Sequence, residues 1–239
     1  MIEVPGAEFY LVGGSVRDQI LGRKVKDRDY VVLTAMSFDE LAAAMERAGA
    51  TIFVRKPEFL TIRARFEGEV FDVAFPRIDG EYVDGRHPTS VTPAQSLRED
   101  AARRDFTINA MSRGSDGELG DFFGGERDLE MRIIRAVGNP HERFREDALR
   151  ILRAIRFAAP LKFDIAAETH LAMPQEAQGL VGISADRIRD ELNKALLADP
   201  VLTFNALREL AIKPRGFFGL LAAKGLTLEA TLRERGVLR

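Results

Sequence analysis

The chain has 239 residues with a formal net charge of −2, 46% hydrophobic residues and 30% charged residues. This composition is ordinary for a globular protein of one large or two smaller domains. No segment approaches the roughly 20 apolar residues of a membrane span and no signal-peptide pattern is present, so we expect a cytoplasmic protein. Because the chain has no cysteine, disulfides, zinc–thiolate sites and cysteine nucleophiles are excluded. Its three histidines are too scattered to predict a metal cluster.

The stretch from Leu11 to Thr34 predicts a strand, a glycine turn, a short helix and a second strand, in that order. Asp27 and Asp29 stand at the start of the second strand. Side chains two apart in a strand project from one face, so both carboxylates can point at one spot. Neighbouring carboxylates repel each other, and a cation between them offsets this repulsion. Hard oxygen ligands of this kind suit Mg²⁺, so Asp27 and Asp29 are candidate metal ligands.

The turn between the first strand and the helix is Gly13-Gly14-Ser15. Backbone N–H groups there, together with the helix N-terminus, can form a cradle for an anion. Considered separately, neither feature requires a ligand: the glycines can be present only because the backbone turns sharply, and the two aspartates can be solvated at the edge of a strand. Their occurrence in one short unit favours a nucleoside-triphosphate site.

The next segments alternate between helix and strand. Ser37 to Ala48 predicts a helix in which Ser37 caps the N-terminus and Glu40 completes the capping box. Strands are predicted at 51–54, 61–66 and 70–75, with Gly68 in the turn between the last two. In the last strand the apolar side chains share one face, which leaves Asp72 on the other. Asp72 is therefore a candidate third carboxylate.

The segment Arg77 to Pro93 is polar and has no periodicity, and a loop of this length favours an active-site loop over a disordered segment. From Ser96 onward the chain is expected to be mostly helical, with a short strand at 118–121. We expect helices at 97–113, 126–131, 140–159, 165–172, 184–198, 200–211 and 226–235. The change to an all-helical pattern near residue 125 predicts a domain boundary.

Two groups of charged residues lie in or just before the predicted helix 140–159: a cluster of arginines and an aspartate–arginine pair. Seven arginines stand between Arg132 and Arg156 against three acidic residues. This patch is as compatible with a phosphate-contacting surface as with a solvated helix face of ion pairs. Asp147 and Arg150 are three residues apart, so a helix would place them on one face. The Asp147 carboxylate could accept a hydrogen bond from the amino group of cytosine or adenine, and Arg150 could donate one to the adjacent ring nitrogen. An ion pair between the two residues on the helix surface is the simpler interpretation.

Six ordered segments now identify a resemblance. They are LVGGSVRD, KDRDYVV, SLREDAARRDFTINAM, DFFGGERDL, RFREDALRILRAIRF and DRIRDELNKAL. The chain resembles the class II tRNA nucleotidyltransferases, the family of CCA-adding enzymes and poly(A) polymerases, over roughly residues 9–200. The resemblance implies an α+β fold: a nucleotidyltransferase head of mixed sheet and helices in 1–125, an all-α neck in 126–200, and a short helical remnant of the body in 201–239.

The resemblance also implies roles for individual residues. Asp27, Asp29 and Asp72 would be catalytic, with Mg²⁺ held by Asp27 and Asp29. The flexible loop associated with addition of the terminal A would include Asp84 to Arg86. The implied nucleotide-binding residues are Gly13, Gly14, Ser15, Arg17, Arg104, Asp105, Asn109, Asp147, Arg150, Arg153 and Arg156.

The implied activity is template-independent addition of C, C and A to the 3′ end of tRNA from CTP and ATP. Poly(A) synthesis, addition of only CC or only A, and a non-enzymatic nucleotide- or RNA-binding role remain alternatives. Two features depart from the family pattern: Phe122 follows Asp121 where the family usually has proline, and the chain is short. The short length is compatible with a natural minimal form, a piece of a longer protein, or one subunit of a homodimer.

Overall fold

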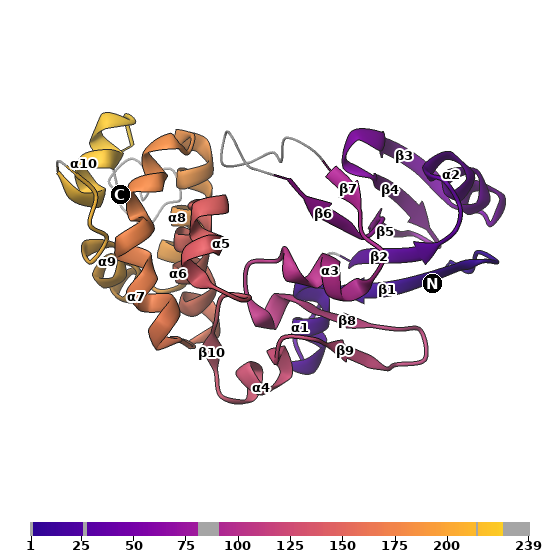
Figure 1. The fold of residues 1–239 in the computed structure, drawn as a ribbon, viewed down its shortest axis with the longest axis horizontal. Coiled ribbons are helices and arrows are strands. Elements are labelled where there is room, and N and C mark those ends of the chain that lie inside the picture. The colour runs from indigo at the N-terminus through magenta and orange to yellow at the C-terminus, as the bar shows by residue number, and fades with distance from the viewer. Residues whose placement is uncertain (1, 26–27, 81–90, 214, 227–239) are drawn as a thin grey trace. The chain divides into compact units, whose positions relative to one another are not determined.

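The computed structural model describes residues 2–25, 28–80, 91–213 and 215–226 (Figure 1). The described chain forms two compact units, one within residues 1–80 and 89–129 and the other from residue 130 onward. We describe each unit by itself. Within the described residues, none of the helices has the length and apolar character needed to cross a membrane.

The first unit is built on a mixed sheet. In the described residues this sheet has seven strands in the order β3-β4-β5-β2-β1-β8-β9. β2 and β5 are parallel, whereas the other neighbours in the sheet are antiparallel. The strands are β1 (Ala7–Val12), β2 (Arg28–Thr34), β3 (Thr51–Lys56), β4 (Thr61–Phe66), β5 (Glu69–Ala74), β8 (Met111–Arg113) and β9 (Leu119–Asp121). Two further strands, β6 (Arg77–Asp79) and β7 (Val91–Pro93), pair separately.

Short helices connect these strands. Ser37 caps α2 and forms the expected capping box with Glu40, which confirms that prediction. Figure 1 shows α2 beside β3 and β4 near one end of the sheet and the β8–β9 hairpin at the other end. The helices are α1 (Gly14–Ile20), α2 (Phe38–Arg47), α3 (Leu97–Ala102) and α4 (Gly125–Glu130), with 3₁₀ turns η1 (Pro57–Phe59) and η2 (Thr107–Asn109).

The sheet buries an apolar face of β2, β4 and β5, and β2 also buries Val31 on its other face. Val32, Ile62 and Val73 are at most 1% exposed, and their neighbours in each strand project to the opposite side. The predicted alternation around Asp72 is therefore confirmed, because Val73 lies in the core and Asp72 is partly exposed on the other face. Burial of one face fixes the strand register, since a slip of one residue would expose the whole apolar set.

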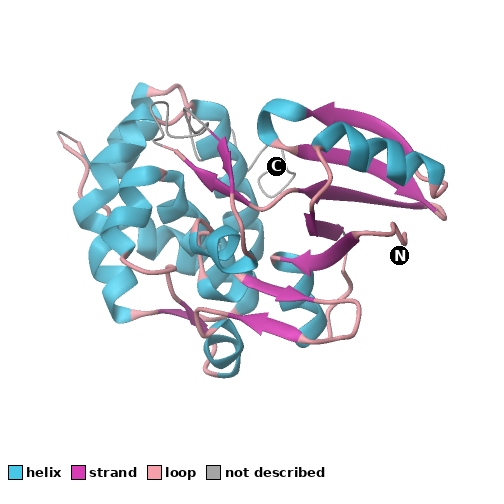
Figure 2. Cartoon of the chain, turned by 45° about the vertical axis from the view of Figure 1, so that its right-hand side comes forward, coloured by secondary structure: helices cyan, strands magenta, loops and turns pink. Residues whose placement is uncertain are grey.

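In its described residues the second unit is helical apart from one short strand pair, and Figure 2 shows most of the described strands in the first unit. Phe144, Ile151 and Ile155 are at most 1% exposed and form an apolar stripe that α5 and α6 bury. The unit contains β10 (Ile133–Ile134), α5 (Pro140–Glu146), α6 (Leu149–Leu161), β11 (Asp164–Ile165), α7 (Ala167–Glu176), η3 (Ala177–Gly182), α8 (Ala185–Ala198), α9 (Pro200–Arg208) and α10 (Gly216–Ala223). The mixed sheet with its helices and the helical second unit confirm the predicted α+β class.

Two predictions of local structure were wrong. The expected helix 97–113 is α3, the turn η2 and strand β8, because Met111 to Arg113 extend the sheet beside β1 and β9. The expected helix 140–159 is two helices, since the backbone of Asp147 is extended. The polar segment 77–93, predicted as an active-site loop, begins and ends in the paired strands β6 and β7. Its part 81–90, which includes Asp84 to Arg86, lies outside the described residues. The helix expected at 226–235 lies almost wholly outside the described residues.

Candidate functional site

Asp29 and Asp72 are brought together by the parallel pairing of β2 with β5. The two residues are direct partners in the register, and adjacent strands lie about 4.8 Å apart. Both side chains therefore project from the same face of the sheet, with Arg63 of β4 in register beside Asp72 and its Nε 3.5 Å from the Asp72 carboxylate. Asp27, the other expected metal ligand, lies outside the described residues.

Asp29 and Asp72 line a pocket of about 460 Å³. Among its described lining residues, basic side chains outnumber acidic ones by five to two. A concave site lined mainly by one sign of charge concentrates ligands of the opposite sign. The charged lining residues are Asp29, Asp72, Lys56, Arg63, Arg77, Arg103 and Arg104.

A divalent cation fits the acidic side of this pocket by donor chemistry. Two carboxylates in register supply hard oxygen atoms, which magnesium prefers, and magnesium usually takes only one or two protein carboxylates. Among the described residues, no group of three or more histidine, cysteine or acidic side chains is placed to hold a metal ion. Asp29 and Asp72 are therefore the described residues that would hold such an ion.

The glycine turn before α1 is in close contact with two arginines. Gly13 has a φ of +71°, which disfavours other residues. A Cβ at Gly13 would lie 2.9 Å from Arg104 Nη1, and one at Gly14 would lie 3.3 Å from Arg17 Nη2. The absence of side chains in the turn thus leaves space for both guanidinium groups. Ser15, the remaining residue of this turn, is buried.

Asp105 and Asn109 support Arg17 from below the surface. Asn109 Nδ2 donates to Asp105 Oδ1 at 3.0 Å, and Arg17 Nη1 donates to Asn109 Oδ1 at 2.7 Å. The backbone N–H of Phe106 also donates to Asp105, at 2.8 Å. Asp105 and Asn109 are both buried. The structure therefore brings together the expected residues of the first unit that it describes, with Asp105 and Asn109 supporting Arg17.

Asp100 is a residue that the sequence analysis missed. Its carboxylate is 2% exposed and forms ion pairs with Arg103 and Arg104 at 2.7 and 2.9 Å. Burial acts to raise the pKa of Asp100, but the guanidinium groups of Arg104 and Arg103 outweigh burial and hold this pKa below its ordinary value. The available signal was spacing, because residues three and four apart meet on a helix.

The expected base-reading pair in the second unit has a different geometry from the one predicted. Asp147 does not lie within a helix: its Oδ1 accepts the backbone N–H of Leu149 at 3.0 Å, at the start of α6. Its Oδ2 accepts a hydrogen bond from Arg187 of α8 at 2.9 Å. Arg150 is in α6 and donates to Glu146 Oε2, also at 2.9 Å. The prediction that Asp147 and Arg150 share one helix face is therefore wrong.

The arginine-rich patch of the second unit is extensively paired. Glu191 of α8 forms ion pairs with Arg153 at 3.7 Å and with Arg156. The Arg156 guanidinium also lies 3.7 Å from the ring centroid of Phe157, a cation–π contact. Arg145 pairs with Glu176. These contacts favour the ion-paired interpretation of the patch over a free cationic surface.

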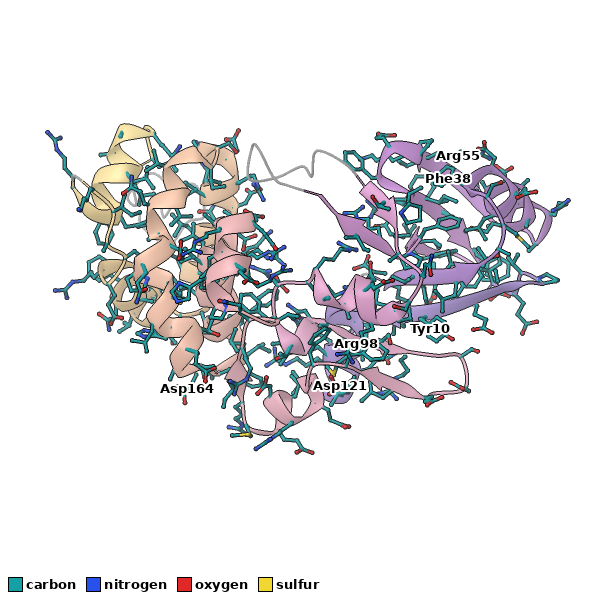
Figure 3. The ribbon with its side chains drawn as sticks, in the orientation of Figure 1. Tyr10, Phe38, Arg55, Arg98, Asp121 and Asp164 are labelled. Carbon is teal, nitrogen blue, oxygen red and sulfur yellow. The ribbon has the colours of Figure 1, made fainter. Side chains whose placement is uncertain are left out.

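The change from the expected proline at residue 122 is compatible with the local structure. Asp121, labelled in Figure 3, accepts hydrogen bonds from the backbone N–H groups of Gly125 at 2.8 Å and Glu126 at 2.9 Å. These contacts occupy N–H groups at the start of α4, as an aspartate cap does. Residue 122 takes no part in them through its side chain, so Phe122 leaves the cap intact.

The mixed sheet, the in-register carboxylates and the glycine turn backed by arginines define a nucleotidyltransferase type of head, followed by a helical unit. The family described as "Poly A polymerase head domain" matches residues 9–135, and "Probable RNA and SrmB- binding site of polymerase A" matches residues 162–213. The chain belongs to this poly(A) polymerase and tRNA nucleotidyltransferase family, as the sequence motifs predicted.

Several relatives share most of this chain. The CCA-adding enzyme of Staphylococcus aureus (strain MRSA252) is 42% identical over 210 residues, which cover 87% of this chain and 51% of that protein. The structure of the Bacillus stearothermophilus CCA-adding enzyme in complex with CTP has a TM-score of 0.73 and 34% identity, covering 93% of this chain and 49% of that one. The Thermotoga maritima CCA-adding enzyme complexed with tRNA has a TM-score of 0.72 and 28% identity, with coverages of 96% and 52%. The chain thus spans about half the length of these relatives.

Proposed function

We propose that this chain carries the catalytic and nucleotide-selecting part of an enzyme that adds C, C and A to the 3′ end of tRNA from CTP and ATP. The observation that carries the proposal is the pocket in which Asp29 and Asp72 face a surplus of basic side chains. The similarity to CCA-adding enzymes supports the same reaction. In our proposal the first unit supplies the head and the helical unit from residue 130 onward supplies the neck.

The first unit would bind the parts that all nucleoside triphosphates share. Arg17 and Arg104 stand against the glycine turn, where guanidinium groups can donate paired hydrogen bonds to phosphate oxygens. Asp105 and Asn109 hold Arg17 in place. In transfer, the 3′ oxygen of the RNA forms a bond to the α-phosphorus, loses its proton, and displaces pyrophosphate. Positioning and charge neutralisation are the main contributions that a protein makes to such a reaction.

We propose magnesium as the cofactor, held by Asp29 and Asp72 together with Asp27, which lies outside the described residues. When bound, divalent ions at such a site lower the pKa of the attacking hydroxyl and neutralise the triphosphate and the pyrophosphate that leaves. The protein's own contribution is to hold carboxylates in register on a rigid sheet, so that no reorganisation is required when the ion binds.

The second unit would select the base. Asp147 offers carboxylate oxygens held between a backbone N–H and Arg187, and Arg150 offers N–H donors held by Glu146. An acceptor with a donor matches the amino group and adjacent ring nitrogen of cytosine and adenine, while uracil and guanine present the opposite order. Arg153 and Arg156 complete the proposed nucleotide-binding set and are held by Glu191.

The proposal is tested by incubating the protein with tRNA that lacks its 3′ CCA, together with labelled CTP or ATP and Mg²⁺. The expected result is addition of two C residues and one A, resolved at single-nucleotide length. Asp29→Asn should remove this activity, whereas Asp164→Asn, at an exposed aspartate of β11 in the other unit, should retain it. Absence of incorporation by the wild-type protein on every tRNA end would refute the proposal.

A poly(A) polymerase is the second candidate, because the family that matches residues 9–135 is described by that name. The same assay separates the two activities. A long A tail made from ATP alone would favour the polymerase, and addition that stops after CC or requires a CC end would indicate a partial enzyme. Nucleotide binding without transfer would indicate a binding module.

A further inference from the structure

Asp100 has both carboxylate oxygens occupied by neighbouring arginines. Its Oδ1 accepts from Arg103 Nε at 2.9 Å and Nη2 at 2.7 Å. Its Oδ2 accepts from Arg104 Nη2 at 2.9 Å and Nε at 3.3 Å. All three residues come from one short segment, with Asp100 in α3 and the arginines at its C-terminal end. Asp100 thus binds each guanidinium group by the edge that contains Nε.

Burial of this carboxylate is not explained by stability alone. A buried ion pair loses hydration, and apolar residues of similar volume often stabilise a fold as well or better. The other ends of the two arginines offer an explanation, because Arg103 and Arg104 both line the pocket that contains Asp29 and Asp72. Arg104 Nη1, on the edge away from Asp100, approaches the glycine turn at Gly13.

We propose that Asp100 is a positioning residue for triphosphate binding, which acts by holding Arg103 and Arg104 at the pocket, and that Arg103 is a further phosphate-contacting residue. This inference rests on the proposed function of the same pocket. A guanidinium group fixed at one edge can present its opposite edge to an anion with little loss of side-chain freedom. Asp100 offsets one of the two positive charges, so the cluster still carries a net positive charge toward the ligand.

The positioning role predicts a specific kinetic pattern. Asp100→Asn keeps the shape of the side chain but removes the charge that orients both arginines. Loss of a charge-assisted hydrogen bond weakens binding about ten- to hundredfold, so we expect KM for CTP to rise by about this factor. The turnover number should change much less, since the carboxylates on β2 and β5 are unaltered. The dissociation constant of CTP, measured by equilibrium dialysis without RNA, should rise in parallel with KM.

The coupling of Asp100 to Arg104 supplies a second test. If Asp100 acts through this arginine, the effects of Asp100→Asn and Arg104→Gln on CTP binding will not add. The double variant should bind CTP about as weakly as the weaker single variant. Additive losses would overturn the inference, because they would show that the two residues act independently.

A matched control separates positioning from simple stability. Asp128 is also a buried carboxylate of the first unit, 4% exposed, and it accepts the Thr107 hydroxyl at 2.6 Å. It does not line the pocket formed by the described residues around Asp29. Asp128→Asn should lower the melting temperature but leave KM for CTP unchanged. If Asp100→Asn behaves in the same way, the residue is structural and the inference is wrong.

A substitute variant and a separate binding measurement cover the cases in which Asp100→Asn does not fold or the protein transfers no nucleotide. Should Asp100→Asn fail to fold, Asp100→Glu retains the charge but moves it by one methylene, and it should also raise KM for CTP. An unchanged KM in folded Asp100→Glu would then overturn the inference. If the wild-type protein binds CTP but transfers none, the proposed function fails, while the dialysis comparison still decides the role of Asp100.

Discussion

Replacing Asp29 with asparagine should have opposite effects on stability with and without a divalent cation. Asp29 and Asp72 are register partners on adjacent strands, so their carboxylates lie roughly 5 Å apart. Coulomb repulsion at this distance is about 0.8 kcal/mol in a water-like dielectric and a few times larger in a less polar one. The lower figure applies because Asp29 is exposed and Arg63 lies beside Asp72. Without a cation, Asp29→Asn should therefore stabilise the first unit by up to about 1 kcal/mol.

A bound cation reverses the sign of this difference. At a concentration one hundred times its dissociation constant, a ligand specific for the folded state adds about 2.7 kcal/mol. Wild-type protein should gain about this amount in Mg²⁺, and Asp29→Asn should gain far less. In calorimetry, where about 1 kcal/mol corresponds to roughly 2–4 °C at this size, the melting curves of the two proteins should exchange order between EDTA and Mg²⁺.

The exchange of order is the decisive result. Asp164→Asn, at an exposed strand position of the other unit, should respond to Mg²⁺ as the wild type does. Equal stabilisation of wild type and Asp29→Asn by Mg²⁺ would refute the metal role of Asp29. A loss of several kcal/mol in EDTA would refute the repulsion argument, since it would mean that the Asp29 carboxylate is needed for folding.

Three further predictions concern packing and titration. Phe144→Ala should cost about 3–5 kcal/mol of unfolding free energy because the ring is 1% exposed, whereas Phe53→Ala, at 51% exposed, should cost far less; equal losses in calorimetry would contradict this. Gly125→Ala should destabilise by about 1–3 kcal/mol, because the new Cβ would clash with the backbone carbonyl oxygen of Thr107; an unchanged melting temperature would contradict this. The hydrogen bond from Tyr10 to Glu8 raises the pKa of Tyr10 to about 12, so stability should fall as pH rises from about 10 toward that value. Glu8→Gln should lower the Tyr10 pKa in an ultraviolet titration, and an unmoved pKa would exclude Glu8 as its cause.

Local patterns in the sequence correctly predicted those features that depend only on residues close together in the chain. The capping box of Ser37 and Glu40 and the alternation that exposes Asp72 both follow from neighbours in the chain. The prediction of one helix over 140–159 failed although a local signal was present. Aspartate favours helix N-termini, and Asp147 accepts the N–H of Leu149 to begin a new helix. A competing apolar stripe obscured this signal, because it continues from Phe144 into α6.

Other features depended on contacts between distant segments. Met111 to Arg113 became a strand because they pair with both β1 and β9, and no local preference of this segment indicates that partnership. The pairing of Asp29 with Asp72 likewise required the order of strands in the sheet. Parallel neighbours need a crossover connection, which here consists of α2, β3 and β4. The sequence therefore predicted a set of site carboxylates but not that two of them are register partners.

The distribution of the candidate residues between the two units has a chemical consequence. The first unit holds groups suited to the metal and the triphosphate, which CTP and ATP share. The second unit holds Asp147 and Arg150, whose hydrogen-bonding groups are suited to a base edge, and each is held by a residue of its own unit, Arg187 or Glu146. If the proposed function holds, separate substitutions should alter catalysis and base choice. Changes at Arg187 should alter the ratio of correct to incorrect bases added, because Arg187 orients the Asp147 carboxylate. Changes at Asp100 should lower the affinity for CTP and for ATP equally, because the triphosphate is the same in both.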